Sequence, residues 1–249
     1  MKWNKAAFVV IAFVFLVGFV SAALADSVED FFGAKSDDFI KYRTYVGGFG
    51  LYTGIDSTNH VNGFNGNVFI TSVASPKEID LLPSISQNFG FGGLVGQREG
   101  PYALEVSYWR SSHNASWTDN ITTYSGTASY QSLNVDFKRY LFTQVPTQPF
   151  FELGVSFPWL VFKDASSDQS GFIGDFSLSG VGINLGVGME IYLGNGFSIM
   201  GSALQRWSGY TDMVGVQQQH TNFQLDGYKN LNVEGNGLNF LVGATMGFE

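Results

Sequence analysis

The sequence predicts an all-β fold, an eight-stranded antiparallel up-and-down β-barrel that spans a membrane. Three observations support this prediction. Apolar residues alternate with small or polar residues in eight separate segments, as expected of strands with two unlike faces. The connections between these segments alternate between short and long. Charged residues make up only 14% of the chain, whereas ordinary soluble domains contain roughly 25%.

Residues 1–25 are predicted to be a cleaved signal peptide. Lys2 and Lys5 precede a long apolar run, which ends in small residues that include Ala23 and Ala25. An uncleaved membrane anchor is the alternative, because the run is long for a signal. Residues 26–249 would then form a single outer-membrane β-barrel domain, with a short N-terminal periplasmic segment over about residues 26–40.

Composition limits the function classes. Removal of Lys2 and Lys5 leaves 11 basic residues against 21 acidic ones, a net charge of about −10, which argues against nucleic acid as a partner. The chain has no cysteine, so neither disulfides nor thiolate metal sites can stabilise it. His60 and His220 stand alone in connecting segments, so we expect no metal site and no cofactor.

The predicted strands follow one another through the chain after the signal. Alternation is clearest over residues 180–193, where Ile183 and Leu185 lie opposite Asn184 and Gly186. It is weakest over residues 197–207, where both faces are mixed. In chain order the eight predicted strands are residues 44–54, 84–96, 101–110, 129–140, 150–159, 180–193, 197–207 and 237–249.

The connections predict how these strands are joined. Short links follow the second, fourth and sixth predicted strands. Long polar links follow the other four, over roughly residues 54–82, 111–128, 160–176 and 208–236. This alternation is typical of outer-membrane barrels, which have short periplasmic turns and longer outer loops.

The alternating pattern also indicates which face meets which solvent. In a soluble ligand-carrying barrel the apolar face points inward, and the outer face of residues 180–193 would then carry mostly glycine, which is too poor in charge for an ordinary soluble surface. We therefore expect the apolar face to contact lipid and the small or polar face to line a narrow lumen. Two aromatic girdles are predicted, Tyr102, Tyr140, Phe150, Tyr192 and Phe248 at the short-turn end, and Tyr52, Tyr108, Trp109, Trp159 and Trp207 at the long-loop end.

Six charged residues fall on the predicted lumen face. Because buried charges need partners, we expect a paired network in which Lys138 and Arg206 are shared among the four acids. A structural plug is one interpretation of this network and a gated polar pathway is the other. Lys41 and Arg43 are predicted to snorkel at the rim. The six lumen residues are Glu105, Asp136, Lys138, Glu152, Glu190 and Arg206.

Two stretches carry a family resemblance. "YVGGFGLYTG" is similar to the first strand of the small eight-stranded outer-membrane β-barrel superfamily, which includes the outer membrane protein A, X and W types. The tail "LVGATMGF" resembles the C-terminal insertion signal of that superfamily at Gly243, Met246 and Phe248, although Glu249 follows the aromatic residue that is usually terminal. The resemblance implies insertion by the barrel-assembly machinery with periplasmic chaperones, and it names no activity.

An enzyme is the least favoured function. Some lipid A-modifying enzymes are barrels of this kind, and such an enzyme needs a nucleophile beside a base. His113 has Ser111, Ser112 and Ser116 close in sequence, but Ala115 departs from the deacylase pattern. We therefore expect no catalytic residues.

The function we expect is a structural or surface-interaction role, in envelope integrity or adhesion, through four long extracellular loops on a monomeric barrel. The alternative is a narrow, porin-like channel for small or hydrophobic solutes. The expected location is the outer membrane of a Gram-negative bacterium. The expected partners are membrane lipid, lipopolysaccharide and a host or envelope ligand.

Overall fold

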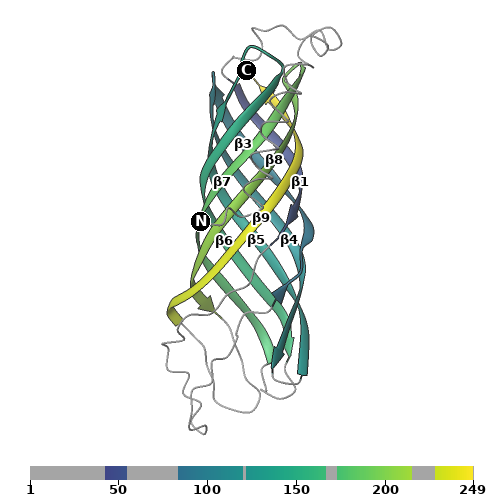
Figure 1. The fold of residues 1–249 in the computed structure, drawn as a ribbon, viewed down its shortest axis with the longest axis vertical. Helices are drawn as coiled ribbons and strands as arrows, with labels where there is room; N and C mark the ends of the chain where they lie inside the picture. The colour runs from purple at the N-terminus through teal and green to yellow at the C-terminus, as the bar shows by residue number, and fades with distance from the viewer. Residues whose placement is uncertain (1–42, 55–83, 120–121, 167–172, 215–227, 249) are drawn as a thin grey trace, which may run out of the picture.

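The computed structural model describes residues 43–54, 84–119, 122–166, 173–214 and 228–248. They form one closed antiparallel sheet of eight long strands, tilted around a common axis (Figure 1). The predicted fold class is therefore confirmed. The strands are β1 (Arg43–Thr53), the two-residue β2 (Ser84–Ile85), β3 (Asn88–Glu99), β4 (Tyr102–Asp119), β5 (Thr122–Tyr140), β6 (Thr147–Ser166), β7 (Ile173–Gly194), β8 (Phe197–Val214) and β9 (Tyr228–Phe248).

Each long strand pairs with its neighbour along the chain, and β1 pairs with β9 to close the barrel. Because the sheet is closed, it has no free edge, and the backbone N–H and C=O groups of the wall can all pair with a neighbouring strand. A sheet surrounded by hydrocarbon requires such pairing. The short β2 pairs with β4 just beyond the start of β3. Within the described ranges no helix is long and apolar enough to cross a membrane.

Three short links lie at one end of the barrel, here called the inner end, together with the C-terminal end of β9. The β7–β8 link is a tight turn at Asn195 and Gly196, which both have positive φ, as a two-residue hairpin turn of type I′ requires. The opposite end is called the outer end. The predicted signal peptide and the segment over residues 26–40 lie outside the described residues.

The strands near the outer end are longer than predicted. β4 runs to Asp119 and β5 starts at Thr122, so most of the predicted loop 111–128 is barrel wall. β6 and β7 likewise extend over much of the predicted loop 160–176, and β8 and β9 over parts of the loop 208–236. The prediction of four long loops was wrong, because only residues 55–83 and 215–227 remain as long connections outside the described strands.

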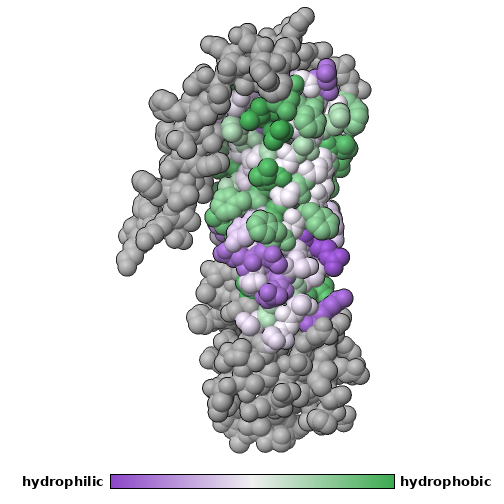
Figure 2. All heavy atoms as spheres, turned by 90° about the vertical axis from the view of Figure 1, so that its right-hand side faces the viewer, coloured by the Kyte–Doolittle hydropathy of each residue, from purple (hydrophilic) through white to green (hydrophobic). Residues whose placement is uncertain are grey.

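The outer face of the barrel changes character along its axis. Figure 2 shows hydrophobic side chains over the part of the wall towards the inner end and hydrophilic ones further out. Large apolar side chains such as Leu153, Ile183 and Leu185 are more than half exposed, as lipid-facing residues of a transmembrane barrel should be. Beyond Tyr108, in contrast, the outward residues of β4 are Arg110, Ser112 and Asn114. The outer part of β4 is therefore suited to water.

Only part of the predicted aromatic girdles faces outward. Tyr102, Tyr108, Trp159, Trp207 and Phe248 are between 38% and 53% exposed. Trp109, Tyr140, Phe150 and Tyr192 were wrongly assigned to the girdles, because they are 1–8% exposed and point into the lumen.

Glycines make room for these inward rings. A Cβ at Gly92 would lie 2.5 Å from Cζ of Phe49, and one at Gly243 would lie 2.6 Å from Cβ of the same residue. Gly96 lies under the ring of Tyr45 and Gly188 under the ring of Phe150. The lumen is thus filled by large side chains packed over glycine, and not only by small and polar residues as expected.

Candidate functional site

The lumen holds all six of the charged residues assigned to it from the sequence. Each is at most 5% exposed, and they come from β4, β5, β6, β7 and β8. Two further buried charges, Arg43 and Arg98, join them. Among the described side chains the buried lumen charges therefore balance, four basic against four acidic, in three groups along the axis.

The first group lies at the inner end and centres on Glu190. Arg43 forms an ion pair with one carboxylate oxygen of Glu190, and Nη1 of Arg98 lies 3.7 Å from the other. Arg43 was predicted to snorkel at the rim, and this was wrong because it is 8% exposed and turned inward. Lys41 lies outside the described residues.

Arg98 is the residue that the sequence analysis missed at this end. It also hydrogen-bonds the Gln148 side chain and lies over the ring of Tyr140 at 3.8 Å. Alternation continued beyond Leu94 and Gly96 would have placed it on the inward face.

The second group surrounds Lys138 in the middle of the barrel. The Lys138 ammonium donates to both carboxylate oxygens of Glu105 at 2.8 Å, and the Tyr45 hydroxyl donates to Glu105 at 3.0 Å. Lys138 also lies directly across the strand pair from Glu152. Oε2 of Glu152 has no hydrogen-bond partner among the residues that the structure describes.

A cavity of about 10 Å³ lies beside these residues, bordered by Glu105, Asp136, Lys138 and Glu152. This volume is close to the space that one water molecule needs. A water there would offer the unpaired oxygen of Glu152 a donor. The cavity is far too small to serve as a pore.

The third group is Arg206 alone. Its guanidinium lies over the rings of Trp109 and Tyr130, with Cζ 4.4 Å and 4.7 Å from the two ring centroids. The prediction that Arg206 is shared among the acids was wrong. Across the strand pair it meets Asn184, whose amide donates to Asp136 at 3.0 Å, so Asn184 takes the place beside Asp136.

His113 lies nearer the outer end, beyond the girdle residue Tyr108. Its Nε2 is 2.7 Å from Oγ of Ser111, and its Nδ1 is 2.6 Å from the carbonyl oxygen of Ser86. Burial lowers the pKa of His113, and the hydrogen bond with Ser86 opposes this change. Ser112 and Ser116 point outward, so of the three candidate serines only Ser111 reaches the imidazole.

The surroundings of His113 are apolar and inward-facing. Ser111 and His113 are each 2% exposed. The buried apolar side chains of this outer part of the lumen are Ile85, Ala115, Ala128, Leu160, Phe162 and Leu178.

The remaining predicted sites have mixed outcomes. Met246 and Phe248 face outward at the inner end of β9, and Gly243 lies against Phe49. Their role as an insertion signal stays a prediction. His60 and His220 lie outside the described residues, and within the described part of the chain no three potential metal ligands come together.

Comparison with known proteins adds evidence on the fold. No family model and no curated protein sequence matches the chain. The solved structure of the outer membrane protein OprG from Pseudomonas aeruginosa matches with a TM-score of 0.52 and 12% identity, over 84% of this chain and 96% of OprG. Neisserial surface protein A matches with a TM-score of 0.46 and 10% identity, over 83% of this chain and 97% of that protein.

The architecture and the OprG match agree on the class of protein. The chain has the fold of the small eight-stranded outer-membrane β-barrels, and the resemblance noted in the sequence is confirmed. At 12% identity the similarity extends to the fold alone.

Proposed function

We propose that this protein is an outer-membrane β-barrel of a Gram-negative bacterium with a structural or surface-interaction role, and that it does not conduct solutes through its lumen. The observation that carries the proposal is the closed middle of the barrel. The ion pair between Lys138 and Glu105 lies in that region, and the pairs between Glu190 and two arginines close the inner end beside it.

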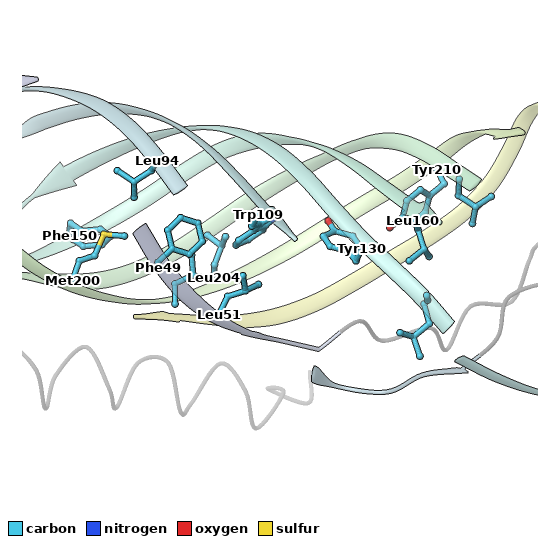
Figure 3. Close-up of a cluster of buried hydrophobic side chains, with 14 of the residues drawn as sticks. Phe49, Leu51, Leu94, Trp109, Tyr130, Phe150, Leu160, Met200, Leu204 and Tyr210 are labelled. Carbon is cyan, nitrogen blue, oxygen red and sulfur yellow. The ribbon is translucent and has the colours of Figure 1, made fainter. Parts of the chain in front are cut away.

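Large side chains complete the closure. Phe49, Phe150, Met200 and Leu204 are each at most 7% exposed and pack in the same part of the lumen (Figure 3). A solute would have to displace these side chains and separate buried ion pairs to pass, which is costly. Function is then expected at the outer end, because loops joined to a rigid wall commonly carry binding functions.

The partners follow from this setting. The apolar outer wall would contact membrane lipid, with lipopolysaccharide around its outer part. The barrel-assembly machinery and periplasmic chaperones would act during insertion, aided by Gly243, Met246 and Phe248. A host or envelope ligand would bind at the outer end.

Planar-bilayer recordings of the purified protein test the closed lumen. We expect no channel openings in salt solution and no swelling of liposomes in small sugars. Steady single-channel conductance of the wild-type protein would contradict the proposal.

Cell attachment tests the surface role separately. A heterologous Gram-negative host that displays the chain should gain attachment to host-cell matrix or resistance to detergent stress. Replacement of residues 215–227 by a short Gly-Asn-Gly link should weaken that gain while heat-modifiable gel mobility is kept. A folded barrel that gives neither property would contradict the surface role.

A second candidate function is uptake of a small hydrophobic solute at the outer end. It is favoured by the apolar outer part of the lumen, where Leu160, Phe162 and Leu178 are buried. Cells that express the chain should then take up a hydrophobic probe faster than cells expressing a Leu160→Arg variant. Equal rates would remove this candidate.

We also propose that the protein is not an enzyme. Ser111 and His113 have the spacing of a nucleophile and a base, but both are enclosed in the lumen and away from the lipid face where lipid A lies. His113→Gln should leave the lipid A acylation profile of an expressing strain unchanged. A profile that depends on His113 would overturn this.

A further inference from the structure

Arg206 differs from the other buried cations of the lumen. Arg43 and Arg98 share Glu190, and Lys138 is paired with Glu105. Arg206 is 4% exposed, yet across the described residues its guanidinium makes neither an ion pair nor a hydrogen bond. A buried charge without a counter-charge is strongly unfavourable, so this cation needs a partner.

The two rings beside Arg206 meet only part of that need. The faces of Trp109 and Tyr130 attract the cation, but they offer no acceptor to Nε, which has no hydrogen-bond partner. Figure 3 shows that Trp109 and Tyr130 lie between two groups of apolar side chains, one around Phe49 and Leu204 and the other around Leu160 and Tyr210.

Further unsatisfied donors surround this point. Trp109 Nε1 and the Tyr130 hydroxyl are buried and have no hydrogen-bond partner within the described part of the chain, and the same holds for the hydroxyls of Ser156 and Ser208. Ser208 lies two residues after Arg206 on the same face of β8. The structure also brings the two serines together, because a Cβ at Gly182, which lies between them in the sheet, would be 2.5 Å from Oγ of Ser156 and 2.6 Å from Oγ of Ser208.

The unpaired acceptors near Arg206 among the described side chains carry no charge. They are Asn184 Oδ1 and the hydroxyl oxygens of Tyr130, Ser156 and Ser208, and the amide of Asn184 already donates to Asp136. Indole and guanidinium groups only donate. Water could complete some of the hydrogen bonds, but it would not neutralise the charge.

We propose that Arg206, Trp109, Tyr130, Ser156 and Ser208 form a binding site for a small monovalent anion, either a halide ion or a carboxylate group. The anion would accept charge-assisted hydrogen bonds from the edge of the guanidinium and bonds from the indole and the hydroxyls. Gly182 has no side chain, so both serine hydroxyls lie close to its backbone and to each other. The site does not depend on the surface role, since it rests on the lumen alone.

The Trp109 indole N–H signal of the full-length mature protein in detergent micelles reports on this site by nuclear magnetic resonance. The signal is identified by its loss in Trp109→Phe. Sodium chloride and sodium acetate are titrated separately, at an ionic strength held constant with the bulky buffer anion HEPES. We expect a saturable shift of the signal in at least one of the two salts. Saturation in chloride alone identifies a halide site, saturation in acetate alone a carboxylate site, and saturation in both a site for either.

Three variants assign the shift to the site. Arg206→Gln should abolish saturation, and Ser208→Ala should weaken the apparent affinity at least threefold. Arg110→Gln is the matched control, because Arg110 is on the same strand as Trp109 but faces outward, and it should behave as the wild type. A wild-type signal that does not saturate in either salt, or saturation that persists in Arg206→Gln, would overturn the proposal.

A second measurement needs no variant. If Arg206→Gln loses heat-modifiable mobility and is therefore unfolded, wild-type crystals soaked in sodium bromide provide the test. We expect a bromide anomalous peak within hydrogen-bond distance of Arg206 Nε when chloride saturates the solution signal, and no such peak would then contradict the proposal. If acetate alone saturates the signal, the Ser208→Ala variant provides the test. An acetate affinity equal to that of the wild type would then contradict the proposal.

Discussion

The inner and outer parts of the lumen are filled on different principles. Towards the inner end, buried arginines and a lysine meet carboxylates in direct ion pairs, with Tyr45, Tyr140 and Phe150 packed around them. Further out, Arg206 has no carboxylate beside it among the described side chains, and the lumen beyond is lined mainly by apolar side chains and the Ser111–His113 pair. The inner part is thus filled by paired charges and aromatic rings, whereas around Arg206 several buried polar atoms have no hydrogen-bond partner among the described residues.

The outward-facing side chains also differ between these two regions. They are apolar where the lumen is charged and polar where the lumen is apolar. Near the inner end, apolar side chains face outward and charges face inward. Beyond the girdle, β4 turns Arg110, Ser112 and Asn114 outward and Ala115 inward. The outer part therefore has the face pattern of a soluble barrel, because water surrounds its wall.

The largest loss of stability is expected when Glu190, the acid of the inner-end ion pairs, is replaced. Glu190→Gln leaves Arg43 and Arg98 without a carboxylate among the described residues, and removal of one partner of a buried ion pair costs about 3–5 kcal/mol. Urea unfolding in detergent micelles measures this loss. Glu99→Gln, at an exposed position on β3, is the control and should match the wild type. Equal stability of the two variants would show that the inner part is not held by this ion pair.

A charge on the lipid-facing wall should have the next largest effect. Leu185 is 51% exposed in the middle of β7, and arginine near the bilayer midplane of such a barrel costs about 2–4 kcal/mol. Folding of Leu185→Arg into lipid vesicles measures the cost. Ser112→Arg places the same charge outward beyond the girdle, where we expect little loss. Similar losses in both variants would contradict the division of the wall.

Glycine under an inward ring provides a smaller effect. A Cβ at Gly188 would overlap the Phe150 ring and approach the Gly201 carbonyl oxygen to 2.6 Å, so Gly188→Ala should cost about 1–3 kcal/mol through overpacking. Gly50→Ala is the control, because Gly50 faces outward and a Cβ there would lie 4.0 Å from the Val242 carbonyl oxygen. Thermal unfolding followed by gel mobility compares the two. No difference between them would mean that the lumen near Phe150 is loosely packed.

His113 should have the smallest effect. Burial lowers the pKa of His113 in the folded state, so the neutral imidazole is favoured there. Its contribution to stability is present above the unfolded-state pKa of about 6.5 and is lost as the pH falls through the lowered pKa. Wild type should lose slightly more stability than His113→Gln between pH 7.5 and pH 5, by less than any change above. A larger loss in the variant would have the wrong sign for this account.

The sequence predicted the strands within the membrane well, for a physical reason. Where lipid lies on one side and a polar lumen on the other, alternation such as Ile183, Asn184, Leu185 identifies strand and face together. The outer extensions of β4 and β5 were predicted as loops, because Ser112, Asn114 and Thr127 make the outward face of that wall polar. The inward Ala115 and Ala128 are too small to restore a visible pattern.

Pairing within the lumen could not be predicted from spacing. The six charged residues point inward because alternation requires it, but their neighbours depend on strand register and shear, which the sequence does not specify. Register sets Asn184 between Asp136 and Arg206 and brings Trp109 and Tyr130 over the guanidinium instead of a carboxylate. The aromatic girdles were overestimated for a related reason, since Trp109 and Tyr108 are adjacent in sequence and face opposite ways.

Site-directed spin labelling in lipid vesicles tests the central claim, that lipid contacts the apolar outer face of this closed sheet. The chain has no cysteine, so a label at Ile183→Cys or Arg110→Cys reports on one position. We predict that the label at position 183 collides with dissolved oxygen far more than with a water-soluble nickel chelate, and that the label at position 110 shows the reverse. Equal access of the nickel chelate to both labels would contradict the account.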